Sequence, residues 1–122
     1  MNIQRYYQDL GDRADQVITA LRDAGIHVWL KVVDPDAEGE IAIWLDGVGD
    51  YEDLALLWHH TTGWFWAGRA DSAHPDTTEV FEDLAVDATA AQVTQATADL
   101  LAWLRNGDTA TDAHTIVGSL FR

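Results

Sequence analysis

The chain has 122 residues, of which 48% are hydrophobic, and a net charge of −14 at neutral pH. This length is typical of one globular domain, and the hydrophobic content argues against an intrinsically disordered chain. The absence of cysteine excludes disulfides and thiolate metal sites. The negative charge disfavours direct binding of nucleic acid, and no apolar run reaches the roughly 20 residues that span a bilayer. We therefore expect a cytoplasmic protein that contacts neither nucleic acid nor membrane.

The first predicted element is a helix over residues 3–24, because apolar residues recur there at three- and four-residue spacing. Gly25 follows at the kind of position where helices commonly end. The next segments alternate between two faces and are separated by turn-forming residues. This pattern predicts strands over 26–33, 40–46, 54–60 and 64–69, with 79–86 as the candidate for a fifth strand.

The second predicted helix follows Thr89, which forms a capping-box pair with Gln92. An apolar stripe then runs to Leu104, and Asn106 with Gly107 ends the helix. Residues 108–122 form a tail whose apolar positions suit either a short helix or an added strand; they are Ile116, Val117, Leu120 and Phe121.

This order of elements predicts an α+β fold. We expect a two-layer sandwich, in which an antiparallel four- to five-stranded meander carries the N- and C-terminal helices on one face. Residues 1–107 are expected to form a single domain, and the tail 108–122 can pack on it.

The segment DYEDLALLWHHTTGWFWAG, residues 50–68, resembles the core of a small actinobacterial domain family of unknown function. In that family a strand of the form D-L-x-L-x-W runs into a polar turn that ends in Gly-Trp. The positions that fit are Asp53, Leu54, Leu56 or Leu57, Trp58, Gly63 and Trp64. The family's prolines before the last helix are missing here. The resemblance supports the fold and implies no activity.

The adjacent histidines His59 and His60 are the first candidates for chemistry. Neighbouring residues of a strand point to opposite faces, so we expect these two not to share a metal ion unless the strand bulges. Asp71 and His74 could add ligands, but the chain has no zinc-binding spacing. Residues 34–40 (DPDAEGE) match part of a calcium loop, but the closing glutamate is missing, which favours an acidic β-turn.

Six tryptophans are the strongest functional signal in the chain. Strand alternation directs Val28, Leu30 and Val32 toward the helices, and Trp29 and Trp44 toward the other face. That second face is expected to be covered by the tail, by a second copy in a homodimer, or by a protein partner.

The tryptophans of the predicted hairpin are less constrained. A three-residue loop would place Trp58 opposite Trp66 and His60 opposite Trp64, so that these residues share a face. Which face they share depends on the register, and a shift of one residue would move them across the sheet.

Acidic residues dominate the middle of the chain, where Arg69 is the only arginine or lysine between Val32 and Leu104. The acidity is open to three interpretations: solubility in a salty environment, docking of a basic protein, or mimicry of nucleic-acid phosphates. The residues expected to form this acidic surface are Asp34, Asp36, Glu38, Glu40, Asp50, Glu52, Asp53, Glu79, Glu82 and Asp83.

The function that these observations favour is a non-enzymatic acidic protein-binding module, such as an adaptor, a chaperone-like protein or an inhibitor. It would need no cofactor or metal, and it would bind a basic protein through an aromatic sheet face rimmed by acids. The expected contact residues are Trp29, Trp44, Trp58, Trp64, Trp66 and His60. One alternative is an inhibitor from a phage or mobile element that mimics nucleic acid, and another is a small enzyme or metal-binding protein that uses His59 and His60.

Overall fold

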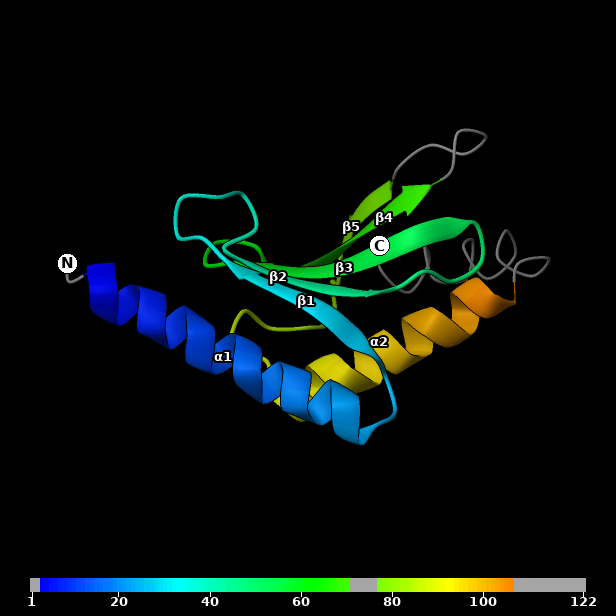
Figure 1. Ribbon diagram of the computed structural model, residues 1–122, viewed down its shortest axis with the longest axis horizontal. Helices are drawn as coiled ribbons and strands as arrows, with labels where there is room; N and C mark the ends of the chain where they lie inside the picture. The colour runs from blue at the N-terminus through cyan, green and yellow to red at the C-terminus, as the bar shows by residue number, and fades with distance from the viewer. Residues whose placement is uncertain (1–2, 71–76, 107–122) are drawn as a thin grey trace.

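The computed structural model describes residues 3–70 and 77–106. Its elements, in chain order, are α1 (Ile3–Asp23), β1 (Val28–Val33), β2 (Ile41–Asp46), β3 (Tyr51–His59), β4 (Gly63–Ala70), β5 (Thr77–Val80) and α2 (Ala90–Arg105). The five strands form one antiparallel sheet in the order β1-β2-β3-β4-β5. Both helices lie on the same side of this sheet (Figure 1), so the predicted two-layer α+β architecture is confirmed. The predicted tail 108–122 and the candidate ligands Asp71 and His74 fall outside the described residues.

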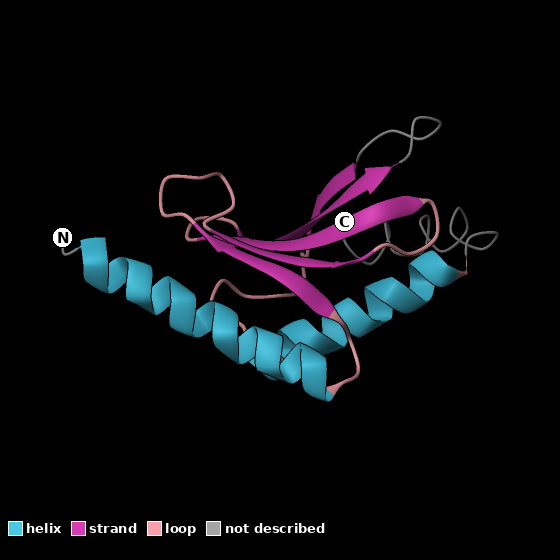
Figure 2. Cartoon of the chain, in the orientation of Figure 1, coloured by secondary structure: helices cyan, strands magenta, loops and turns pink. Residues whose placement is uncertain are grey.

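The core fills the space between the helices and the inner face of the sheet. Figure 2 shows these two layers. Apolar side chains at helical spacing on α1 and α2 pack against apolar side chains from the strands. The largest fully buried side chains include Leu10 and Leu21 of α1, Val93 of α2, and Ile41, Ile43, Leu45, Leu54, Leu56 and Trp64 of the sheet. Neither described helix is both long and apolar enough to cross a membrane.

The register of β1 departs from simple alternation at Trp29. Val28 pairs with Leu45 and Leu30 pairs with Trp44, which makes Trp29 the extra residue of a β-bulge. Beyond the bulge, Leu30 lies on the face away from the helices, so the prediction that Leu30 and Val32 point toward them is wrong.

The side chain of Lys31 points toward the helices instead. Its Nζ lies 2.8 Å from Asp15 Oδ1 on α1. The bulge therefore places Lys31 and Val33, instead of Leu30 and Val32, on the inner side of this edge strand.

The β3–β4 hairpin differs from the predicted pairing by two residues. Trp58 pairs with Trp64 and His59 pairs with Gly63, which leaves residues 60–62 as the loop. Gly63 has a φ of +75°, a conformation that side chains with a Cβ rarely adopt. In this register Trp58, Trp64 and Trp66 all face the helices.

The fifth strand ends earlier than predicted, at Val80. Phe81 donates its backbone N–H to the carbonyl of Trp64 (3.1 Å) and buries its ring in the core. The chain then leaves the sheet and runs beneath it to α2, as Figure 1 shows. Further along, the carbonyl of Val86 accepts a hydrogen bond from Trp58 Nε1 (2.8 Å).

The second helix begins as predicted. Thr89 Oγ1 accepts a hydrogen bond from the N–H of Gln92 (3.1 Å), and Gln92 Oε1 accepts one from the N–H of Thr89 (2.9 Å). Both halves of the capping box are thus present, and Asn106 is the C-cap.

Candidate functional site

The face of the sheet that points away from both helices carries two rows of mostly apolar side chains, because residues that pair across an antiparallel ladder share a face. We call these rows the outer sheet face. One row is Val32, Ala42, Leu57, Phe65 and Val80, and the other is Leu30, Trp44, Ala55, Ala67 and Thr78. Both helices lie on the opposite side of the sheet (Figure 2).

The outer sheet face has its most exposed apolar side chains at its two edges. Leu30 is 41% exposed, Val32 42% and Val80 44%. Near one end, the loop that connects β1 and β2 passes close over the sheet, since a Cβ at Gly39 would lie 2.5 Å from Leu57 Cδ2. The apolar side chains at the two edges are therefore exposed, Ala42 and Ala55 in the middle of the face are buried, and the loop bounds one end.

Trp29 and Trp44 form an aromatic pair at the β1 side of this face. Their ring centroids are 6.0 Å apart, and the ring planes are tilted by 43°. Trp29 Nε1 donates to the carbonyl of Leu45 (3.0 Å), which fixes the indole while leaving 48% of the residue exposed. Trp44 is half-buried. The pair thus combines exposed aromatic area with little rotational freedom.

Three other tryptophans that we expected to contact a partner are core residues. Trp58 is 5% exposed, Trp64 1% and Trp66 2%. Trp58 also lies under the guanidinium of Arg13 on α1, whose Cζ is 4.5 Å from the ring centroid. Their expected role in partner binding is corrected by this burial. Trp58 pairs with the core residue Ile41 of β2, and the β3–β4 ladder places Trp64 and Trp66 on the same helix-facing side.

The expected acidic surface is present except at one position. Most of its members are exposed, and Asp53 and Glu79 are partly buried. Asp34 Oδ1 accepts a hydrogen bond from the N–H of Asp36 (2.9 Å), which is the geometry of a polar turn. Glu40 is the exception, because it is only 1% exposed, and its assignment to the surface was wrong.

The Glu40 carboxylate links three parts of the fold. Oε1 accepts a hydrogen bond from the hydroxyl of Tyr6 on α1. Oε2 accepts from the backbone N–H of His60 (2.6 Å) and lies 2.9 Å from His60 Nδ1 in the β3–β4 turn. Burial by itself would raise the pKa of Glu40, but these hydrogen bonds outweigh it and lower the pKa below its usual range. The group is thus a buried, ionised and well-satisfied carboxylate.

The two histidines lie together rather than apart. β3 ends at His59 and His60 belongs to the turn, so strand alternation no longer separates them. Their ring centroids are 4.4 Å apart in a stacked arrangement, and His59 Nε2 is 3.9 Å from Glu40 Oε2. We expected the two histidines not to share one site unless the strand bulged. That expectation was wrong, because the chain changes direction at the turn and brings the His60 side chain next to His59.

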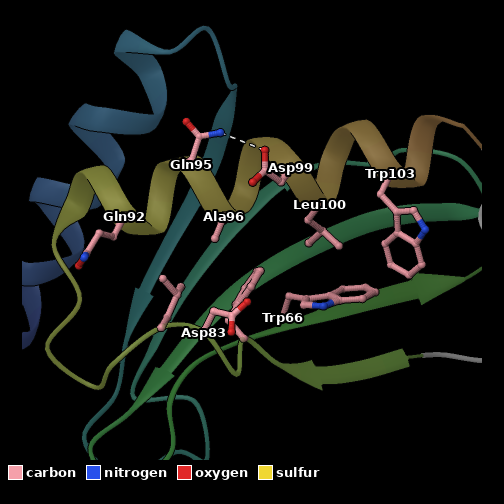
Figure 3. Close-up of a pocket in the computed structure, with 10 residues that line it drawn as sticks. Trp66, Asp83, Gln92, Gln95, Ala96, Asp99, Leu100 and Trp103 are labelled. Atoms are coloured by element: carbon pink, nitrogen blue, oxygen red, sulfur yellow. Dashed lines mark hydrogen bonds between the residues drawn. The ribbon is translucent and has the colours of Figure 1, made fainter. Parts of the chain in front are cut away.

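A cleft of about 420 Å³ lies on the helix side, between α2 and the sheet (Figure 3). Figure 3 shows Ala96, Leu100 and Trp103 pointing from α2 toward the strand that carries Trp66. Asp83 and Asp99 add negative charge to the lining. The volume is within the range of small-molecule pockets, and the aromatic and acidic lining suits an apolar group that carries a positive charge.

The predicted contact residues omitted the aliphatic part of the outer sheet face and Phe65. A signal for Phe65 was present, because it stands between Trp64 and Trp66 and must point outward if they point inward. No such signal existed for Leu30 and Val32, since their orientation depends on the bulge.

Comparison with known proteins found no match: no family model, no curated protein and no solved structure is similar to this chain. The resemblance to the small actinobacterial family therefore stays a prediction.

Proposed function

We propose that this protein is a non-enzymatic protein-binding module, and that its outer sheet face binds an apolar, basic segment of another protein. The observation that carries this proposal is the exposure of Trp29, Leu30, Val32 and Val80, each more than 40% exposed, on or beside one apolar sheet face. Trp29, Leu30 and Val32 lie together on β1, and a cluster of exposed apolar side chains of this kind commonly marks an interaction site, whereas Val80 lies at the opposite edge on β5.

The aromatic pair suits the centre of such an interface. Tryptophan is enriched among the residues that dominate binding energy. Trp29 is already fixed by its hydrogen bond to Leu45 and by its contact with Trp44. Binding would therefore order few additional side chains, which lowers its entropic cost.

The charge of the protein selects the kind of partner. Asp34, Asp36 and Glu38 lie in the loop that bounds one end of the face, and Asp46 and Asp53 form the next pair of its ladder at the other end. The exposed Asp34, Asp36 and Glu38 attract a basic segment and raise its rate of association, whereas Asp53 is already paired with Arg69. A second copy also carries a net charge of −14 over its whole chain, and the repulsion between the two copies disfavours a homodimer through this face.

The free edge of β1 is a less suitable docking site than the face. A bulge at Trp29 and the inward-pointing Lys31 interrupt this edge, and both are features by which proteins prevent unwanted strand pairing. We therefore assign binding to side chains of the face rather than to addition of a strand.

A synthetic peptide of alternating leucine and lysine tests the proposal, with an alternating leucine–glutamate peptide as the charge control. We expect the lysine peptide to bind in isothermal titration calorimetry and the glutamate peptide not to bind. Trp44→Ala and Val32→Ser should each weaken binding about tenfold, because they remove apolar contact area. Tyr7→Ala is the matched control, since Tyr7 is 52% exposed on α1, away from the face.

Other outcomes would contradict the proposal. If the face variants bind as tightly as the wild type and binding disappears at high salt, the acids alone carry it, as expected for a mimic of nucleic acid. If light scattering detects a dimer that Val32→Ser dissociates, the face binds a second copy. If the lysine peptide does not bind at all, the proposed partner chemistry is wrong.

A further inference from the structure

The turn between β3 and β4 and the start of β2 bring one carboxylate and two imidazoles together. Glu40, His59 and His60 each offer one oxygen or nitrogen atom, and these atoms all lie within 4.8 Å of one another. The proposed protein-binding function does not use this grouping, although His59 borders the outer sheet face beside Phe65. Imidazole nitrogens with a carboxylate oxygen are the donor set of many zinc and related metal sites.

The carboxylate is positioned as a metal ligand requires. Glu40 is 1% exposed, and the Tyr6 hydroxyl holds its Oε1 while the N–H of His60 holds its Oε2. Hydrogen bonds of this kind orient a ligating carboxylate before the metal arrives. A cation bound between this carboxylate and the two imidazole rings would balance the buried negative charge.

The His59 ring is held through the nitrogen that does not face Glu40. Its Nδ1 lies 2.8 Å from the Thr61 hydroxyl and accepts the N–H of Thr61 at 3.1 Å. Metal binding at Nε2 requires the other tautomer, in which Nδ1 carries the proton and donates it to the Thr61 hydroxyl. The Thr61 N–H then donates its hydrogen bond to water, which can reach it because Thr61 is exposed.

The distances suit one small ion. Ligand atoms at 2.0–2.1 Å from a tetrahedral metal are about 3.3 Å apart. The Glu40 oxygen lies 2.9 Å from His60 Nδ1 and 3.9 Å from His59 Nε2, so the two separations bracket this value. The His60 side chain is 59% exposed and can adjust without disturbing the core.

From this geometry we propose that Glu40, His59 and His60 bind one divalent transition-metal ion, with Zn²⁺ as the best fit. Two nitrogen donors favour such an ion over Mg²⁺ and Ca²⁺, which prefer oxygen ligands. Three protein ligands leave a fourth position for water. His59 also lines a hollow of about 340 Å³ together with Glu38 and Phe65, which gives the ion a route from solvent.

Titration of the EDTA-treated full-length protein with ZnCl₂ and with CoCl₂ tests this site. We expect saturable binding of one ion per chain, with a Co²⁺ absorption spectrum typical of tetrahedral nitrogen and oxygen ligation. His60→Ala and His59→Ala should each weaken binding at least about tenfold. His27→Ala is the matched control, because His27 is an exposed histidine that pairs with Asp46 (3.0 Å) outside the cluster.

Two results would overturn the proposal. If the His59 and His60 variants bind Zn²⁺ as tightly as the wild type, the ion binds elsewhere. If millimolar Mg²⁺ displaces Zn²⁺ from the wild type, the net charge of −14 attracts cations without a specific site. Circular dichroism of both variants confirms that they fold, and neither substitution removes a buried side chain.

Discussion

Tyr6 and Glu40 fix the N-terminal part of α1 to the start of β2 through a single hydrogen bond between side chains. Desolvation by burial, the hydrogen bond to Glu40 and its negative charge raise the pKa of Tyr6 from 10.0 to about 12. The stabilisation from neutral Tyr6 is complete below pH 10 and is lost as the pH rises toward 12.

The pKa of Glu40 is shifted in the opposite direction from that of Tyr6. Its pKa is lowered below 4.5, so the stabilisation from the ionised carboxylate is complete above that pH. This stabilisation is lost as the pH falls through the lowered pKa. The Tyr6–Glu40 pair therefore stabilises the fold fully only between about pH 4.5 and pH 10.

Tyr6→Phe tests this pair in the metal-free protein. We expect the free energy of unfolding at pH 7 to fall by about 1.5 kcal/mol, because a hydrogen bond to a charged group is lost. The variant should also lose the extra decline in stability between pH 10 and 12, and its decline below about pH 4.5 should be smaller, because the pKa of Glu40 then lies closer to its usual range. Urea denaturation across this pH range measures all three effects.

Tyr7→Phe is the control for that experiment, since it makes the same chemical change at an exposed neighbour. We expect its stability to stay within about 0.5 kcal/mol of the wild type at every pH. Equal effects of the two substitutions would mean that the Tyr6–Glu40 hydrogen bond contributes nothing to stability.

At the scale of elements, α2 leaves the sheet incompletely packed where the cleft of Figure 3 lies. Ala96 points into this cleft, and its small side chain leaves part of the volume unfilled. The capping box and apolar stripe predicted α2 correctly, but they contain no information about how closely the helix approaches β4.

Ala96→Leu should therefore stabilise the protein. The added side chain would fill part of the cleft and bury apolar surface, for an expected gain of about 1 kcal/mol in the free energy of unfolding. Ala102→Leu on the same helix is the matched control, because Ala102 is exposed, and its effect should be within about 0.5 kcal/mol. Thermal denaturation monitored by circular dichroism compares the two variants, and destabilisation by Ala96→Leu would show that the cleft is closed in solution.

The strands illustrate why alternation alone is insufficient. It correctly placed Ile41, Ile43 and Leu45 on one face of β2 and Trp44 on the other. It failed for β1, because one extra residue at the bulge reverses the direction of every side chain that follows. The orientation of the 58–66 tryptophans was likewise decided by how β3 pairs with β2 and with β4.

At the scale of the whole molecule, the charge of −14 opposes the compact state. Folding concentrates these charges in a small volume, and salt screens their repulsion over about 10 Å at 0.1 M. We expect the free energy of unfolding to rise by about 1 kcal/mol when NaCl increases from about 0.02 M to about 0.5 M.

A charge-reduced variant separates this effect from other actions of salt. Glu52→Gln, Glu82→Gln and Asp83→Asn together remove three exposed negative charges. The variant should gain less stability from NaCl than the wild type, as measured by urea denaturation at both salt concentrations. An equal gain in the two proteins would mean that self-repulsion is not what salt relieves.

The sequence by itself determined the order of helices and strands, the α2 cap and the acidity, because each depends on local spacing or on composition alone. Tertiary structure decided which side chains are available at the surface. The bulge at Trp29 exposes Leu30 and Val32. The pairing of β3 with β2 and β4 buries Trp58, Trp64 and Trp66, and the turn at His60 brings two histidines to the buried Glu40. Each of these outcomes depends on how segments pair across space, and a shift of one residue in that pairing reverses the face on which a side chain lies.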